Sequence, residues 1–131
     1  MMIVPFYAAI LGLMYVALSI RTLRVRRRLQ IAIGDAGNPE MMRAMRVHSN
    51  FSEYVPLSLL LLFFAEYTGA HGAFVHVMGL CLLVGRGVHA FGVSQVREDY
   101  RLRVFGMSMT FAVLTATSLY LVYAYLIRSV A

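Results

Sequence analysis

Long runs of apolar residues divide the chain into segments that can cross a membrane. Residues 1–20, 67–85 and 104–127 contain no Asp, Glu, Lys or Arg. A helix needs about 20 apolar residues to cross the hydrocarbon layer of a bilayer, so each run predicts a spanning helix. A fourth apolar run, 54–65, is too short alone. It becomes long enough if its helix includes the polar residues before it and Glu66 after it.

Capping and turn residues set the limits of four predicted helices. Asn38 and Pro39 suit the N-cap and first turn of the second helix, and the sequence TGAHG at 68–72 predicts a turn before the third. The predicted spans cover approximately residues 3–24, 40–67, 72–95 and 102–127. The pattern therefore predicts one all-α domain over residues 1–131, an integral membrane four-helix bundle threaded up-down-up-down.

The third predicted helix carries small residues that favour helix packing. Gly79, Gly85 and Gly87 are expected to let neighbouring helices approach closely. Cys81 is the single cysteine of the chain, so no intrachain disulfide can form. It is expected to be a small packing residue.

Composition agrees with a membrane location. Hydrophobic residues make up 60% of the chain and charged residues only 14%, whereas a soluble domain is nearer half apolar and a quarter charged. The mean hydropathy is +0.72. The first apolar run differs from a signal peptide because its basic residues follow it instead of preceding it. We therefore expect a retained helix.

All 12 basic residues are arginine, and they are distributed unevenly. Six lie between the first and second spans and three between the third and fourth: Arg21, Arg24, Arg26, Arg27, Arg28 and Arg43, then Arg97, Arg101 and Arg103. The connection 68–73 has none. Because basic loops stay in the cytoplasm, the first and third loops are predicted inside and both termini outside. The net charge of +6 then requires no nucleic-acid partner.

The second predicted helix carries a stripe of polar residues. Arg46, Asn50, Glu53 and Tyr54 follow the spacing i, i+4, i+7, i+8, which places them on one helix face about 12 Å long. His48 lies about 200° from Arg46 and faces elsewhere. Polar and charged groups at membrane depth usually mark function, so the stripe is a candidate site.

Other polar residues are expected at the same cytoplasmic end of the bundle. They are Arg21 and Arg24 of the first helix, Arg86 and His89 of the third, and Arg101 and Arg103 of the fourth. Guanidinium groups bind carboxylates in pairs of hydrogen bonds, and a glutamate can pair with an amine. The cluster therefore predicts a site for a small zwitterionic or anionic ligand. In the alternative interpretation, Arg46 and Glu53 only neutralise each other to hold the bundle together.

The polar stripe also carries a family resemblance. The motif R-x-x-x-N-x-x-E-Y-x-P, formed by Arg46, Asn50, Glu53, Tyr54 and Pro56, resembles the second-helix signature of the MAPEG family, the membrane-associated proteins in eicosanoid and glutathione metabolism. The size, the four spans and the basic first loop also agree. The segments GDAGNPE, GRGVHAFG and FGMSMT resemble the small bacterial YecN-type branch, which implies a bacterial inner membrane.

The resemblance implies a homotrimer that binds glutathione, as co-substrate, between subunits near the cytoplasmic face. The residues implied to contact the tripeptide are Arg46, Asn50, Glu53 and Tyr54, with Arg24 or Arg21 adding a carboxylate contact. Arg103, or else Arg101, would match the arginine that activates the thiol. A thiol of pKa about 8.5 is mostly protonated at neutral pH, and a nearby cation raises its thiolate fraction. The thiolate would attack a lipophilic electrophile from the bilayer, as in glutathione transferase or peroxidase chemistry. No metal is implied.

The third helix departs from the family pattern. Eicosanoid-type members carry tyrosines near its end, where this chain has His89 and Val93. His89 could substitute as a hydrogen-bond donor, and Arg86 is expected to close the pocket or to pair with Glu53. These departures leave open a MAPEG-fold protein that binds or scaffolds without catalysis.

Two other classes fit the sequence less well. A small multidrug transporter would place its glutamate in the first span, which is free of charge here. A haem protein would need histidines on a common face, but His76 and His89 lie about 220° apart on one helix.

Overall fold

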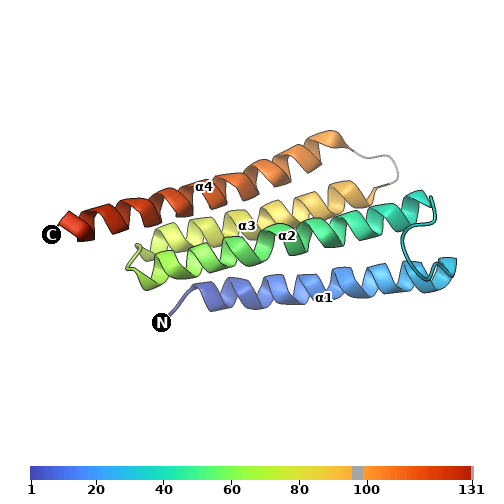
Figure 1. Ribbon diagram of the computed structural model, residues 1–131, viewed down its shortest axis with the longest axis horizontal. Helices are drawn as coiled ribbons and strands as arrows, with labels where there is room; N and C mark the ends of the chain where they lie inside the picture. Colours follow the sequence, from blue (N-terminus) through green and yellow to red (C-terminus); the bar gives the residue numbers. More distant parts are fainter. Residues whose placement is uncertain (96–98, 131) are drawn as a thin grey trace.

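The computed structural model describes residues 1–95 and 99–130, and this part of the chain forms four helices and no strand. The helices are α1 (Val4–Leu29), α2 (Pro39–Tyr67), α3 (Gly72–Ser94) and α4 (Tyr100–Val130). They lie side by side in alternating directions, and both termini are at one end of the bundle (Figure 1). The predicted all-α, up-down-up-down bundle is confirmed. Arg97, part of the predicted basic third loop, lies outside the described residues.

Three of the helices are long and apolar enough to cross a membrane. They are α1, α3 and α4, the last over Tyr100–Ser129. The helix α2 does not meet the same criterion, because polar residues occupy its N-terminal half and Glu66 lies near its end. It is nevertheless 29 residues long and packs along α1, α3 and α4. The protein is therefore an integral membrane bundle in which the most polar helix has helical neighbours on several sides.

The core joins all four helices near the middle of the bundle. Leu11, Phe51, Val55, Leu82 and Val113 form one buried cluster. The helices α1 and α4 do not contact each other in the described residues, so each keeps a wide outer face. Apolar side chains populate these faces, as shown by Leu13 of α1 (73% exposed) and Leu119 of α4 (64% exposed). Lipid chains can solvate such faces, whereas water cannot do so favourably.

Glycines set the distance between neighbouring helices at particular places. A Cβ atom added to Gly106 of α4 would lie 2.5 Å from the carbonyl oxygen of Gly85 in α3, and one added to Gly79 would lie 2.4 Å from the ring of Tyr7. Both contacts are shorter than real Cβ atoms allow. The predictions for Gly79 and Gly85 are confirmed. The prediction for Gly87 is wrong, because that position faces open space.

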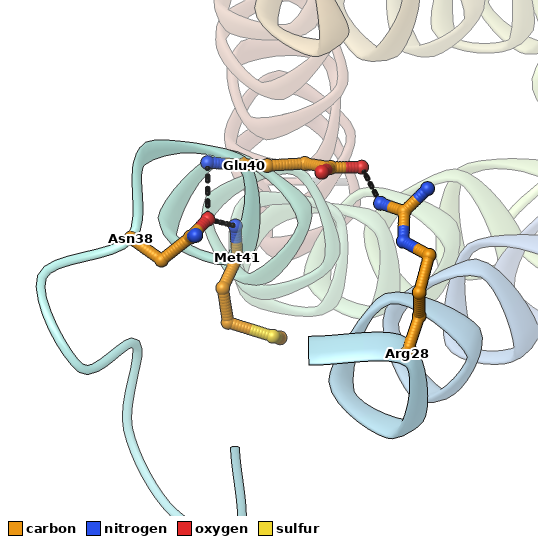
Figure 2. A network of polar contacts seen from close by, with 4 residues as sticks. All are labelled: Arg28, Asn38, Glu40 and Met41. Atoms are coloured by element: carbon orange, nitrogen blue, oxygen red, sulfur yellow. Dashed lines mark hydrogen bonds and ion pairs between the residues drawn. The ribbon is translucent and has the colours of Figure 1, made fainter. Parts of the chain in front are cut away.

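The connection between α1 and α2 is held by a helix cap and an ion pair. Asn38 Oδ1 accepts hydrogen bonds from the backbone N–H groups of Glu40 (2.9 Å) and Met41 (3.1 Å), as Figure 2 shows. This confirms the predicted cap, which satisfies two N–H groups that have no partner within the helix. The Glu40 carboxylate in turn pairs with Arg28 of α1 (Figure 2). The corner therefore ties the two helices together at the end of the bundle opposite both termini (Figure 1).

The opposite end has its own polar link. The Glu66 carboxylate, near the end of α2, accepts the backbone N–H of Ile3 and that of Val4, the latter at 2.9 Å. An anion at a helix N-terminus is stabilised both by these hydrogen bonds and by the helix dipole. Glu66 thus caps α1 from a neighbouring helix.

Candidate functional site

A polar pocket opens at the end of the bundle that carries the α1–α2 and α3–α4 connections. Its volume is about 380 Å³, and small-molecule sites begin near that size, at roughly 300 Å³. Side chains of α2, α3 and α4 line it: Met42, Arg43, Arg46, Ser49, Asn50, Glu53, His89, Val93 and Arg103. Five of the residues singled out from the sequence therefore come together, from three different helices.

The stripe on α2 forms one wall of this pocket. Arg46 and Glu53 are exposed to it, and Asn50 between them is half-buried. Arg103 at the start of α4 and the buried His89 of α3 complete the opposite side. The pocket therefore combines guanidinium groups with one carboxylate and one amide.

Arg46 and Glu53 do not neutralise each other. Within residues 1–95 and 99–130, the only ion pair joins Arg28 and Glu40, outside the pocket. Seven residues of helix separate Arg46 from Glu53 by about 10 Å along the axis, so each side chain faces the pocket separately. The interpretation of this pair as an internal structural ion pair thus finds no support in the geometry.

Arg86 lies behind the α2 wall and does not line the pocket. Only 1% of its side chain is exposed. Its Nη1 donates to Asn50 Oδ1 at 2.7 Å, and its Nη2 donates to the Gly106 carbonyl at 3.4 Å. The alternative pairing with Glu53 is not formed among the described residues. Arg86 therefore bonds to a pocket residue from inside the bundle.

Tyr54 is also set back from the pocket. Its ring packs edge-to-face against Phe111 of α4, with 5.7 Å between ring centroids. The guanidinium carbon of Arg86 lies 5.9 Å from the centre of the Tyr54 ring. The Tyr54 ring therefore contacts Arg86 instead of lining the pocket.

Three predicted arginines lie away from the pocket within a single chain. Arg21 and Arg24 line a second cavity of about 400 Å³ along α1, which also includes Arg28 and Glu40. Arg21 donates to the Ser94 hydroxyl of α3. Arg101 is exposed at the start of α4 and does not line the pocket. Arg103, two residues later, does.

Sequence reasoning missed three pocket residues on α2. Met42, Arg43 and Ser49 lie at i−4, i−3 and i+3 from Arg46, so helical spacing could have identified them. The charge pattern instead groups Arg43 with the basic loop that sets the topology. Its Nη1 donates to the Val93 carbonyl at 3.3 Å, which places its guanidinium against the end of α3.

His48 and His76 each contact a residue of α1. His48 Nε2 lies 3.0 Å from the Ser19 hydroxyl, and its ring stacks on Tyr15 of α1. This confirms that His48 faces away from the stripe. His76 Nδ1 lies 3.2 Å from the Tyr7 hydroxyl. In the described residues, no group of three or more His, Cys, Asp or Glu could hold a metal ion.

Comparison with known proteins gives one consistent result. The model of the MAPEG family matches residues 4–123. The chain is 35% identical over 113 residues to inner membrane protein YecN of Escherichia coli strain K12, and the match covers 86% of this chain and 85% of that protein. The same protein of Escherichia coli O6:H1 (strain CFT073) matches equally well, at 35% identity over 113 residues.

Proposed function

The chain belongs to the MAPEG family, and from this premise we propose that it is an inner-membrane protein that binds glutathione in the α2–α3–α4 pocket. The observation that carries the proposal is the composition of the pocket wall. Arg46, Asn50 and Glu53 face one cavity together with Arg103. These are the residue types that a charged tripeptide requires, gathered from α2 and α4.

The charges of the pocket complement those of glutathione. The peptide has two carboxylates and one ammonium group at neutral pH. The pocket offers three guanidinium groups, from Arg43, Arg46 and Arg103, and one carboxylate, from Glu53. Guanidinium groups bind carboxylates through charge-assisted hydrogen bonds. We assign the ammonium group to Glu53 and the carboxylates to the arginines and Asn50, with Arg86 and Tyr54 supporting that wall and His89 as a further donor.

The proposed reaction is conjugation of a lipophilic electrophile. Arg103, with Arg101 as the second candidate, would lower the pKa of the bound thiol and so increase the thiolate fraction. The thiolate attacks an electrophilic carbon of a substrate that arrives from the bilayer. A carbon–sulfur bond forms, and the electron pair leaves with a leaving group or is taken up by a conjugated acceptor.

The proposed assembly is a homotrimer, as the resemblance to the family's enzymes implies. Support comes from the charged side chain of Glu53, which is exposed and has no ion-pair partner in the described part of the chain. Charges at the membrane are stabilised when a neighbour pairs with them. In this arrangement α1 of the adjacent subunit brings Arg21 or Arg24 to the pocket.

A second candidate function is binding without catalysis. It is favoured by the side of the pocket formed by α3, where His89 and Val93 occupy places at which eicosanoid-type members carry tyrosines. No phenol lines the described pocket, because Tyr54 is set back against Phe111. The tyrosine contacts expected in those enzymes are therefore replaced in this chain by His89 and Val93.

Two measurements on the purified protein test these proposals. Calorimetry of the full chain in detergent should give saturable binding of glutathione, and the bound thiol should show increased ultraviolet thiolate absorbance. A panel of lipophilic electrophiles should then be conjugated. Absence of binding refutes the proposed function. Saturable binding with no conjugation across the panel identifies the protein as a non-catalytic binder.

A further inference from the structure

The hydrogen bond between Arg86 and Asn50 fixes the orientation of the Asn50 side chain. An asparagine amide has a carbonyl that accepts and an NH₂ group that donates, whereas a guanidinium group only donates. The Asn50 atom that lies 2.7 Å from Arg86 Nη1 must therefore be the carbonyl oxygen. No hydrogen bond from Asn50 Nδ2 is found within the described residues. The NH₂ group is thus the half of the amide that remains for the pocket.

Arg86 is itself held firmly in this position. Its Nη2 group contacts the Gly106 carbonyl and Met107 Sδ, the latter at 3.2 Å, both on α4. Because Gly106 has no Cβ, α4 can approach α3 closely enough to offer this carbonyl. The Tyr54 ring covers another side of the guanidinium group. Contacts with two helices restrain Arg86, and Arg86 in turn restrains Asn50.

The buried charge of Arg86 also acts on the pocket. The side chain is 1% exposed, and no carboxylate pairs with it in the described part of the chain. Its Nε atom has no hydrogen-bond partner. Burying an unpaired charge is costly and usually indicates a role beyond packing. Its positive charge polarises the amide, which strengthens the Asn50 N–H groups as donors.

We propose that Arg86 is a positioning residue that locks the Asn50 amide with its N–H groups toward the pocket, so that this wall selects a ligand carboxylate. The inference rests on the proposed glutathione function for the identity of the ligand. It goes further by assigning a donor role to Asn50 and an indirect role to Arg86. Arg86 does not touch the ligand itself. Through Asn50 it determines which functional group of the ligand this pocket wall accepts.

The chain allows a direct test of the amide orientation. Asn38 and Asn50 are its only asparagines, so protein labelled with ¹⁵N-asparagine gives two side-chain NH₂ signal pairs by NMR. Asn50→Asp removes one pair and so assigns both. In the free protein, Arg86→Met should shift the Asn50 pair and leave the Asn38 pair unchanged. Arg86→Lys, which can still donate to the carbonyl, should restore most of the wild-type shift. Unchanged Asn50 signals in Arg86→Met would overturn the positioning role.

The selectivity is tested with glutathione and two analogues, each with one carboxylate converted to a primary amide. In the wild type, glutathione should shift the Asn50 signals but not those of Asn38. One of the two analogues should bind about 10-fold more weakly than glutathione, as expected for loss of a charge-assisted hydrogen bond. Arg86→Met should lose most of that discrimination. If glutathione binds the wild type while the Asn50 signals stay unchanged, the donor role is refuted although the proposed function survives.

A second variant keeps the proposal testable if Arg86→Met does not fold. Asn50→Asp is similar in size and offers Arg86 a carboxylate, so its thermal unfolding should match that of the wild type. It replaces the donor by an anion, and should therefore prefer the amide analogue over glutathione. If Asn50→Asp still binds glutathione more tightly than the amide analogue, by the same ratio of affinities as the wild type, the inference is contradicted. If the wild type binds no glutathione, the proposed function fails, and the free-protein NMR comparison alone decides the role of Arg86.

Discussion

At the scale of single residues, the arginines of the site differ in how they are held. Arg46 is exposed to the pocket, whereas Arg43 donates to the end of α3 and Arg86 is buried behind Asn50. An exposed side chain can be removed without leaving a buried group unpaired, but a buried one cannot. Substitutions of Arg46 and Arg103 therefore report on function with less effect on folding than substitutions of Arg86.

The contribution of Arg46 to binding can be measured directly. Arg46→Ala should weaken glutathione binding roughly 10- to 150-fold, since a hydrogen bond to a charged group contributes about 1.5–3 kcal/mol. Calorimetry gives the dissociation constant. Arg27→Ala is the matched control, because Arg27 is an exposed arginine that lies in neither cavity. Equal affinities of the two variants would show that the pocket is misassigned.

Arg103 is expected to act on the thiol more than on affinity. Arg103→Ala should leave glutathione binding largely intact while it decreases the thiolate absorbance of the bound peptide and any conjugation rate, because the cation near the sulfur is lost. Arg101→Ala provides the comparison, since Arg101 does not line the pocket. A larger loss of thiolate in Arg101→Ala than in Arg103→Ala would exchange the two roles.

At the scale of elements, the crossing of α3 and α4 supports the site. Gly85 and Gly106 bring the two backbones close together, and the Gly106 carbonyl accepts from Arg86. The spacing of two helices therefore determines the position of a side chain that bonds to a pocket residue. Close packing of small residues is a common source of stability between membrane helices.

A methyl group at this crossing should separate the helices. Gly106→Ala should lower the free energy of unfolding by about 1–3 kcal/mol, as overpacking commonly does. Its new Cβ would lie 2.7 Å from the His89 Cβ and 2.5 Å from the Gly85 oxygen. Gly87→Ala is the control, because that position faces open space. Thermal unfolding in detergent compares them, and a Gly106→Ala protein as stable as Gly87→Ala would contradict the packing argument.

At the scale of the whole molecule, orientation and assembly determine what the pocket can reach. The pocket is lined by residues of α2, the end of α3 and the start of α4. The beginning of α2, the end of α3, the start of α4 and the arginine-rich end of α1 lie at one end of the bundle, opposite both termini (Figure 1). If basic residues keep this end in the cytoplasm, the proposed ligand glutathione would enter from the cytoplasm and the proposed lipophilic substrates would enter from the bilayer.

Reporter fusions test the orientation. A reporter placed after Gly37, between α1 and α2, should give a cytoplasmic signal, and one placed after Gly69, between α2 and α3, should not. The reason is the difference in arginine content between the two connections. The opposite pair of signals would reverse the proposed orientation.

Native mass spectrometry tests the assembly. Protein released from detergent micelles should appear as trimers, because Arg21 or Arg24 of a neighbouring α1 can pair with Glu53. Glu53→Gln should weaken the trimer without unfolding the protomer, since the Glu53 side chain is exposed. A spectrum with only monomers or dimers would refute the trimer.

The sequence alone determined the features that depend on neighbours along the chain. The apolar runs predicted the helices, Asn38 predicted its cap, and helical spacing placed Arg46, Asn50 and Glu53 on one face. Hydrophobic periodicity and capping are local, so they can be read without knowledge of the fold.

The tertiary structure decided which residues from different helices meet. It placed Arg103, and not Arg101, on the pocket, and it paired Arg86 with Asn50 instead of Glu53. It also showed that Gly106, and not Gly87, permits the close contact of α3 with α4. These outcomes depend on how each helix is rotated about its axis and how closely it packs. Rotation and packing follow from the side chains of all the helices together, and no single segment of the sequence specifies them.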